Sequence, residues 1–325
     1  MKKLCIVNYV YGEKYQDFIP LYILSLAESY PEYDVRIYVD KKITPKINDV
    51  LKKLSGYYDN FTIIEDYELT SKLNEKAKSI QQIQRCQRWL FFDEAFNDYE
   101  AVYIGDIDLL ICKEKKPLFE QHCVHSEAMG VPYSNISRAG NKKSFAPRML
   151  ARNLIKFGLI QSLKYYTGSS VSETKFSGLH FVKTKEYFDA VCPLIDGFYD
   201  ELNKLANGKS KKYNLCSFNN EAFLRDIVLN AGFKDVPLST GLPYNIEEDA
   251  TKVAYRPHHG IHLGIFRSPL LIEAEKKVIS SDLYKDYYRQ FSELEKTEAY
   301  KEICAHFSDS LNKQLEEMKK FYASL

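Results

Sequence analysis

The sequence lacks several features that would assign a chain to a protein class directly. No stretch reaches 18 consecutive apolar residues, so no transmembrane helix is expected. The net charge is only +1, and this argues against nucleic acid as the main partner, because duplex binders usually carry a concentrated basic face. Low-complexity segments and internal repeats are also missing. The 325 residues, 45% of them apolar, suffice for one large domain or two ordinary ones.

The cysteines form no recognisable binding or cross-linking pattern. There are seven, an odd number, and none belongs to a CxxC pair. This favours free thiols in a reducing compartment over a zinc site or a disulfide framework. The first apolar run ends after about six residues, which is shorter than the hydrophobic segment of a signal peptide. The sequence therefore predicts a cytoplasmic protein, with a position at the inner face of the membrane left open.

Strand-like and helix-like segments alternate over the first hundred or so residues. Strands are expected at 4–10, 34–40, 61–66 and 101–111, and helices at 15–31, 44–56 and 79–96. This order is typical of an α/β fold with a mostly parallel central sheet flanked by helices. In such folds, ligands bind beyond the carboxyl ends of the strands.

The pattern is less regular after residue 111. A strand is expected at 127–134, a flexible flap or insertion at 134–175, a strand and helix across 176–191, and a helix at 219–233. Two or three amphipathic helices follow. We therefore expect a catalytic domain at 1–270 and a C-terminal helical extension at 271–325. The apolar spacing in the extension favours packing, although its lysines and aromatic residues leave peripheral membrane contact open.

Two aspartates interrupt the apolar stretch "AVYIGDIDLLI". Asp106 and Asp108 are two residues apart and would share one face of a strand. Two ionised carboxylates in an apolar run are costly unless they are neutralised, and a divalent cation such as Mn²⁺ or Mg²⁺ would neutralise them. Two alternatives stay open: surface aspartates at the end of a strand, and a Mg²⁺-dependent phosphohydrolase, in which this motif normally follows the first strand.

A second polar cluster is "HHGIHLGIFR", residues 258–267. Imidazole binds Mn²⁺ well alongside carboxylates, which makes His262 a candidate ligand. Arg267 could hold two phosphate oxygens at once. The alternative is a loop whose histidines and arginine have no shared role.

Four stretches, in order along the chain, resemble a known family. "IVNYVYG", "YIGDIDLLI", "FSGLHFVKTKEYFDAV" and "HLGIFR" resemble segments of nucleotide-sugar-dependent glycosyltransferases of the GT-A fold, most closely the family-8-like galactosyltransferase and glycogenin type. The resemblance implies a Rossmann-like sheet and transfer of a sugar from a nucleoside-diphosphate sugar, UDP type favoured, to a glycan or lipid-linked acceptor hydroxyl. It favours retention over inversion, and a bacterial enzyme of capsule, lipopolysaccharide or other surface-glycan synthesis. A non-catalytic nucleotide-sugar-binding protein of the same fold is the alternative.

The resemblance also implies which residues bind the donor. Asp106, Asp108 and His262 would hold Mn²⁺ or Mg²⁺, and the aspartates would hold the diphosphate through it. Arg267 would replace the usual lysine of an H-x-G-x-x-K pattern. The remaining donor contacts that it implies are Asn8, Tyr9 and Val10 near the base and ribose, Ile107 between the aspartates, Ser177 and Gly178 at a strand start, and Gly264 close to phosphate.

Two further segments offer catalytic candidates. Arg88, three residues after Arg85 in a predicted helix, could reach the donor phosphate or sugar, unless this is a solvated helix face. Asn219, Asn220 and Glu221 stand at a helix start and match a polar triplet that contacts the transferred sugar in the family. Glu221 could also serve as a general base, and an asparagine here could simply cap the helix.

Overall fold

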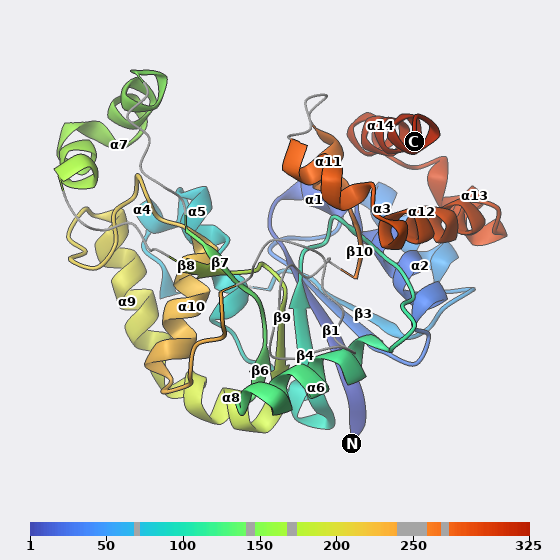
Figure 1. Cartoon of the computed structure of the whole chain (residues 1–325), viewed down its shortest axis with the longest axis horizontal. Helices are drawn as coiled ribbons and strands as arrows, with labels where there is room; N and C mark the ends of the chain where they lie inside the picture. Colours follow the sequence, from blue (N-terminus) through green and yellow to red (C-terminus); the bar gives the residue numbers. More distant parts are fainter. Residues whose placement is uncertain (68–71, 141–146, 168–173, 239–258, 268–272) are drawn as a thin grey trace.

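The computed structural model describes residues 1–67, 72–140, 147–167, 174–238, 259–267 and 273–325. Its centre is a six-stranded sheet in the order β3-β2-β1-β4-β9-β6 (Figure 1). The strands are β1 (Lys2–Val10), β2 (Asp34–Val39), β3 (Phe61–Ile64), β4 (Tyr99–Gly105), β6 (Tyr133–Ser134) and β9 (His180–Lys183). β1, β2, β3 and β4 run parallel, whereas β9 is antiparallel to both of its neighbours. The predicted α/β fold with a mostly parallel central sheet is confirmed.

Helices cover both faces of the sheet because its strands are apolar on both sides. Along β1, Leu4 and Ile6 join one buried cluster and Cys5 and Val7 join the other, as the two-residue period of a strand requires. The first cluster is covered by α2 (Ile19–Ser29), α3 (Pro45–Leu54) and the C-terminal helices, and the second by α8 (Thr184–Val191), α9 (Ile195–Ala206) and α10 (Asn220–Asn230).

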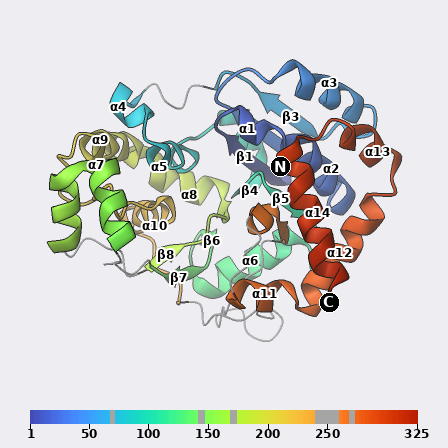
Figure 2. The ribbon, with the colours of Figure 1, turned by 90° about the horizontal axis from the view of Figure 1, so that it is seen from above.

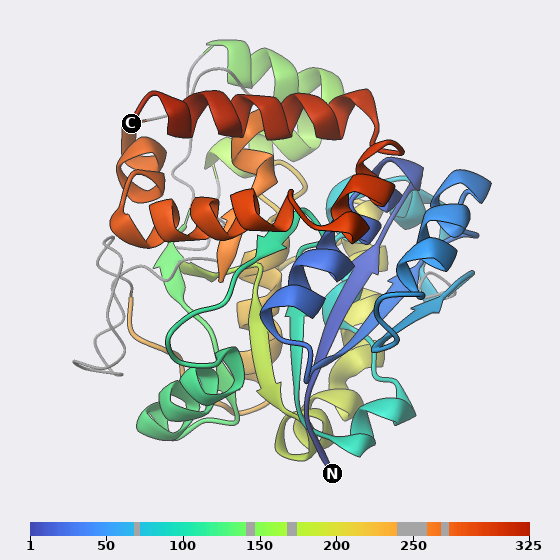
Figure 3. The ribbon, with the colours of Figure 1, turned by 90° about the vertical axis from the view of Figure 1, so that its right-hand side faces the viewer.

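The C-terminal helices pack onto the first cluster. They are α11 (Glu273–Ile279), α12 (Asp282–Leu294), α13 (Glu298–Cys304) and α14 (Asp309–Ala323), more than the two or three predicted. α12 and α13 contact α2, as Figure 3 shows. Tyr284, Tyr287 and Phe291 are buried, so the apolar spacing of this region reflects packing, as expected. Among the helices that can be described, none is both long and apolar enough to span a bilayer.

Two helix predictions were wrong in extent. The helix expected at 15–31 is divided into α1 (Glu13–Gln16) and α2, because Pro20 has no amide hydrogen and is accommodated only in the first turn of a helix. The helix expected at 79–96 is instead a series of short turns. Asp93 has an extended backbone and its side chain accepts a hydrogen bond from the Ala95 amide, so it starts a new turn and does not continue a helix. These turns are α5 (Gln81–Gln84) and 3₁₀ helices at Gln87–Trp89 and Glu94–Asp98. One more short helix, α4 (Glu75–Lys78), precedes the segment.

Two strand predictions were also wrong. The strand expected at 101–111 ends at Gly105, and β5 (Leu109–Ile111) pairs instead with β10 (Gly260–His262) in a separate antiparallel ribbon. The first half of the segment at 127–134 belongs to the end of α6 (Leu118–Met129) and its cap. Gly130 adopts a left-handed φ of 63° and ends that helix, so only Tyr133 and Ser134 remain as strand β6.

The segment predicted as a flap or insertion contains regular structure. β7 (Ser137–Ala139) and β8 (Thr174–Phe176) form an antiparallel ribbon. Between them lies α7 (Pro147–Thr167), which is kinked at Gly158, where φ is 78°. Figure 2 shows α7 at the edge of the molecule, beside α9. All seven cysteines are free, as predicted.

Candidate functional site

A pocket of about 260 Å³ lies beyond the carboxyl ends of β1 and β4, where the fold class predicts a ligand. It gathers residues from the first half of the chain, from the start of α10 and from the segment after β10. The lining residues are Tyr9, Val10, Tyr11, Tyr15, Gln81, Gln84, Arg85, Arg88, Asp106, Ile107, Asp108, Asn220, Glu221, His262 and Arg267.

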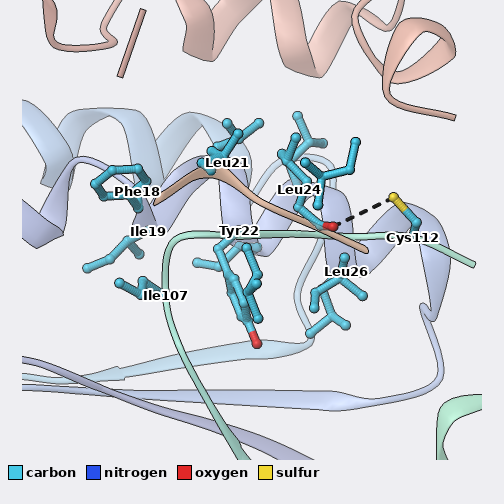
Figure 4. Packing of buried hydrophobic residues seen from close by; sticks show 14 of the residues in the cluster. Phe18, Ile19, Leu21, Tyr22, Leu24, Leu26, Ile107 and Cys112 are labelled. Atoms are coloured by element: carbon cyan, nitrogen blue, oxygen red, sulfur yellow. Dashed lines mark hydrogen bonds between the residues drawn. The ribbon is translucent and has the colours of Figure 1, made fainter. Parts of the chain in front are cut away.

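The two aspartates meet in this pocket although they do not lie in one strand. β4 ends at Gly105, and residues 106–108 form the turn that leads into β5. Ile107 is only 6% exposed and packs near Ile19 and Tyr22 (Figure 4). Because Ile107 is anchored in the core, the turn is fixed, and both flanking carboxylates reach the pocket.

Asp108 is buried between two groups from the far end of the chain. His262 Nε2 lies 3.2 Å from Oδ1 of Asp108, and Arg267 donates a 2.6 Å hydrogen bond to Oδ2. Pairing of β10 with β5 sets His262 opposite Leu109, which explains how residues so distant in sequence meet. Burial alone would raise the pKa of Asp108, but His262 and Arg267 outweigh it and lower the pKa to about 2. Burial lowers the pKa of His262, but Asp108 and Asp106 together raise it above its ordinary value.

Asp106 is paired with Arg88. The guanidinium donates to Oδ1 of Asp106 and lies 4.2 Å from the centre of the Trp89 ring. Gly178 closes this side: a Cβ there would be 3.0 Å from both the Arg88 guanidinium and Oδ2 of Asp106, and 3.7 Å from Glu221. The Arg88–Asp106 pair therefore packs against Gly178, where there is no room for a side chain.

Gly264 packs against Asp108 as Gly178 packs against Asp106. A Cβ at Gly264 would lie 2.9 Å from Nε2 of His262 and 3.1 Å from Oδ2 of Asp108. Any larger residue would therefore press on the side chains of both.

The start of α10 supplies the opposite wall. Asn219 is a helix cap, since its Oδ1 accepts from the amides of Glu221 and Ala222 at 2.8 and 3.1 Å. Asn220 and Glu221 line the pocket. Oε1 of Glu221 accepts from Arg138 at 2.6 Å and Oε2 lies 3.0 Å from Lys175, so each carboxylate oxygen already faces a cation.

Two predicted donor contacts lie away from the pocket. Asn8 shares the sheet face of Leu4 and Ile6, and its side chain is fully buried. Ser177 borders a separate small cavity beside His259.

Several residues of the site were missed by the sequence reasoning. Tyr11 and Tyr15 follow β1 directly and would have been found by considering every residue after that strand. The Arg267 guanidinium lies 5.6 Å from the centre of the Tyr15 ring. Gln81 and Gln84 of α5 line the pocket, and Arg138 and Lys175 of the β7–β8 ribbon carry no sequence signal that links them to Glu221.

The donor atoms suit a hard divalent cation. Asp108 and His262 are in contact, and Asp106 opens into the same pocket, which gives carboxylate oxygens and an imidazole nitrogen. Over the residues that the structure describes, no three His, Cys, Asp or Glu side chains are gathered tightly enough to form a complete metal site. Asp106 faces Arg88 instead, so it would have to turn to join the other two.

Comparison with known proteins gives only distant likenesses. No family model and no curated protein sequence matches the chain. Among solved structures, the mannosyltransferase Ktr4p from S. cerevisiae in complex with GDP aligns with 68% of this chain and 66% of its own, at 12% identity and a TM-score of 0.40. The galactosyltransferase LgtC in complex with donor and acceptor sugar analogs aligns with 92% of this chain and 99% of its own, at 14% identity and a TM-score of 0.37.

A third neighbour is the glycosyltransferase GlyE of Streptococcus pneumoniae TIGR4. It aligns with 96% of this chain and 64% of its own, at 13% identity and a TM-score of 0.38. The chain thus spans about two thirds of the length of Ktr4p and of GlyE. All three neighbours are glycosyltransferases, but TM-scores this low do not establish a shared function.

Proposed function

We propose that the chain is a metal-dependent glycosyltransferase of the GT-A type that uses a nucleoside-diphosphate sugar. The observation that carries this proposal is the turn at residues 106–108. Its two carboxylates open into one pocket at the carboxyl end of β4, with Arg88 on one side and His262 and Arg267 on the other. Carboxylates and an imidazole can hold a divalent cation, and guanidinium groups can pair with the phosphate oxygens of a diphosphate bound to it.

Asp106, Asp108 and His262 would hold Mn²⁺ or Mg²⁺. The ion would stabilise the negative charge that develops on the departing diphosphate. Arg88 and Arg267 would donate to diphosphate oxygens. The Arg88 guanidinium lies over the Trp89 ring and that of Arg267 lies near the Tyr15 ring, at 4.2 and 5.6 Å from the ring centres. Gly178 and Gly264 keep the floor beside these side chains free of further atoms.

One wall of the pocket would contact the nucleotide of the donor, and the opposite wall would contact its sugar. Tyr9 and Val10 lie where the base and ribose would bind, with a UDP-type nucleotide favoured, and Ile107 supports the diphosphate between them. Asn220 and Glu221 would contact the transferred sugar, with Glu221 positioned by Arg138 and Lys175. Asn8 and Ser177 would act from behind the pocket by supporting its walls.

The finer assignments are also part of the proposal. We extend the proposal to a retaining hexosyl transfer to a glycan or lipid-linked acceptor in the synthesis of a bacterial surface glycan. We assign the catalytic domain to residues 1–270, with 134–175 as a flap or insertion, and the helical extension to 271–325. A cytoplasmic location, at the inner face of the membrane, would bring the enzyme to such acceptors.

Thermal unfolding with a panel of nucleoside diphosphates, each with and without Mn²⁺, tests the proposal. At a hundredfold excess over its dissociation constant, a ligand of the folded state adds about 2.7 kcal/mol of stability. We expect a clear Mn²⁺-dependent shift for one base, and its loss in Asp108→Ala and in His262→Ala. Asp49→Ala, an exposed acid on α3, is the matched control and should keep the shift.

Three outcomes would count against the proposal. Equal binding with and without metal would remove the metal-dependent site. Metal-dependent binding without sugar transfer or slow donor hydrolysis would indicate a non-catalytic nucleotide-sugar-binding protein. Release of phosphate from an aryl phosphate with Mg²⁺ would indicate a phosphohydrolase.

A further inference from the structure

The polarity of α7 is the reverse of that expected for a surface helix. Such a helix normally turns its apolar stripe toward the protein and its polar side chains toward solvent. In α7, Asn153 and Ser162 are among the buried side chains, at 1% and 2% exposed. Five aliphatic side chains face outward: Leu154 at 44%, Ile155 at 87%, Leu159 at 62%, Ile160 at 70% and Leu163 at 54% exposed. An exposed apolar patch of this kind usually marks an interaction surface.

This arrangement is held in place by specific hydrogen bonds. The kink at Gly158 folds α7 back on itself, and Asn153 of the first half donates to the Tyr166 hydroxyl of the second half at 3.1 Å. Asn214 donates to the main-chain carbonyl of Gln161 at 2.9 Å. The polar residues therefore attach α7 to the chain, and its aliphatic side chains stay exposed. The helix itself lies at the edge of the molecule (Figures 1 and 2).

The charge of α7 indicates what covers these side chains. The helix contains Arg148, Arg152, Lys156 and Lys164 and no acidic residue, and all four cations are exposed. Among residues whose placement is described, no ion pair joins any of the four to an acid. A second copy of the chain would bring four more cations against these four, so self-association through this face is disfavoured.

We propose that α7 docks the protein on an anionic lipid bilayer. Ile155, Leu159 and Ile160 would enter the boundary between headgroups and acyl chains. The arginines and lysines would meet lipid phosphates, because their long apolar stems allow the charged ends to remain in the headgroup layer. The C-terminal helices do not offer the same surface, since their aromatic side chains are buried or, like Tyr288 and Phe321, packed against the core.

Docking through α7 would also place the candidate site near the bilayer. A groove of about 700 Å³ between α7 and the segment around α4 and α9 is lined by Gln81, which also lines the candidate pocket. The groove and the pocket therefore lie on either side of Gln81. A lipid-linked acceptor could reach the donor along this groove, and that idea rests on the proposed function. The docking of α7 does not rest on it.

Sedimentation with lipid vesicles tests the docking, with no nucleotide or metal present. We expect the protein to bind vesicles of equal parts phosphatidylglycerol and phosphatidylcholine at least about tenfold more tightly than pure phosphatidylcholine, and this preference to weaken with salt. The double variant Ile155→Glu/Ile160→Glu should lose at least about tenfold in affinity for the anionic vesicles. Arg152→Glu/Lys156→Glu should lose the preference for anionic lipid.

The control is Leu238→Glu/Leu325→Glu, which adds the same charge at exposed apolar residues outside α7 and should bind vesicles as wild type does. Failure of the wild type to bind anionic vesicles would overturn the proposal, as would an equal loss in the control. A dimer in light scattering that Ile155→Glu/Ile160→Glu converts to a monomer, with vesicle binding unchanged, would overturn it in favour of a second copy. Because no nucleotide is present, failure here leaves the nucleotide test of the proposed function unaffected.

Discussion

Gly178 lies where one added methyl group would reach both partners of an ion pair. A Cβ there would stand 3.0 Å from the Arg88 guanidinium and from Oδ2 of Asp106. Both are the ends of flexible side chains, so Gly178→Ala should displace them by a few tenths of an ångström without unfolding the chain. We expect metal-dependent nucleotide affinity to fall by about tenfold or more, since site geometry is sensitive to shifts of this order. Isothermal titration calorimetry in the presence of Mn²⁺ measures this affinity.

Gly197→Ala is the matched control for this prediction. Gly197 lies in α9, and a Cβ there would have no atom within 4 Å. Alanine should stabilise the helix by up to about 1 kcal/mol and leave nucleotide affinity unchanged. An unaltered affinity in Gly178→Ala would show that Arg88 and Asp106 do not need their present positions.

His180 should make stability depend on pH. Its side chain is fully buried, and burial lowers its pKa from 6.5 to about 3. Below pH 6.5 the unfolded chain takes up a proton that the folded chain refuses, so stability is full above that pH and falls as the pH decreases toward 3. Between pH 6.5 and 5 the loss should be about 2 kcal/mol.

The variant His180→Phe tests this dependence by urea unfolding at pH 7 and pH 5. Phenylalanine suits the surrounding rings of Trp89, Tyr133 and Tyr187 and cannot take up a proton. Whatever its absolute stability, it should lose about 2 kcal/mol less than wild type over this interval. His306→Asn, near the surface, should keep the wild-type dependence, and an unchanged slope in His180→Phe would assign the effect to other groups.

At the scale of elements, the β5–β10 ribbon brings the two halves of the site together. Gly260 permits this pairing, because its φ is 150° and a Cβ there would be 1.8 Å from the Leu110 carbonyl oxygen. Gly260→Ala should therefore separate β10 from β5 and move His262 and Arg267 away from Asp108. We expect a loss of several kcal/mol in unfolding free energy and no measurable Mn²⁺-dependent nucleotide binding.

Gly232→Ala provides the comparison for Gly260→Ala. Gly232 also has a positive φ, 83°, but a Cβ there would have no atom within 4 Å. Its cost should be limited to backbone strain, roughly 1–2 kcal/mol, with nucleotide binding kept. Circular dichroism during urea unfolding measures both variants, and equal costs would mean that the carbonyl of Leu110 can move aside.

The elements also show what the sequence could and could not predict. The apolar runs and the carboxyl-end rule were enough to predict the sheet and the place of the ligand pocket. The aspartates were expected on one face of a strand, but a core contact of Ile107 holds them in a turn, and no local pattern reveals that contact. The expected helix at 79–96 was wrong because Asp93 begins a new turn through its hydrogen bond with the Ala95 amide, and the apolar spacing does not show that bond. Arg138 and Lys175 meet Glu221 only through tertiary packing.

At the scale of the whole molecule, the C-terminal helices and the first strands share one buried cluster. Met318 of α14 is fully buried in the cluster that contains Leu4 and Ile6, and Phe266, next to Arg267, packs against Phe321. We therefore expect residues 1–325 to unfold in one cooperative transition. Met318→Ala should lower the unfolding free energy by about 2–5 kcal/mol and shift that single transition, as calorimetry can measure. Leu325→Ala, at an exposed position, should change it little, and a separate early transition in Met318→Ala would show that the helices unfold alone.

The pairing of Arg88 with Asp106 and of Arg267 with Asp108 has a consequence for the order of loading. Each carboxylate already has a positively charged neighbour, so an incoming cation must compete with a tethered one. An anion that drew both guanidinium groups toward itself would free oxygens on both acids at the same time. Cation and nucleotide should consequently strengthen one another's binding, and by the reciprocity of coupled equilibria the two enhancements must be equal.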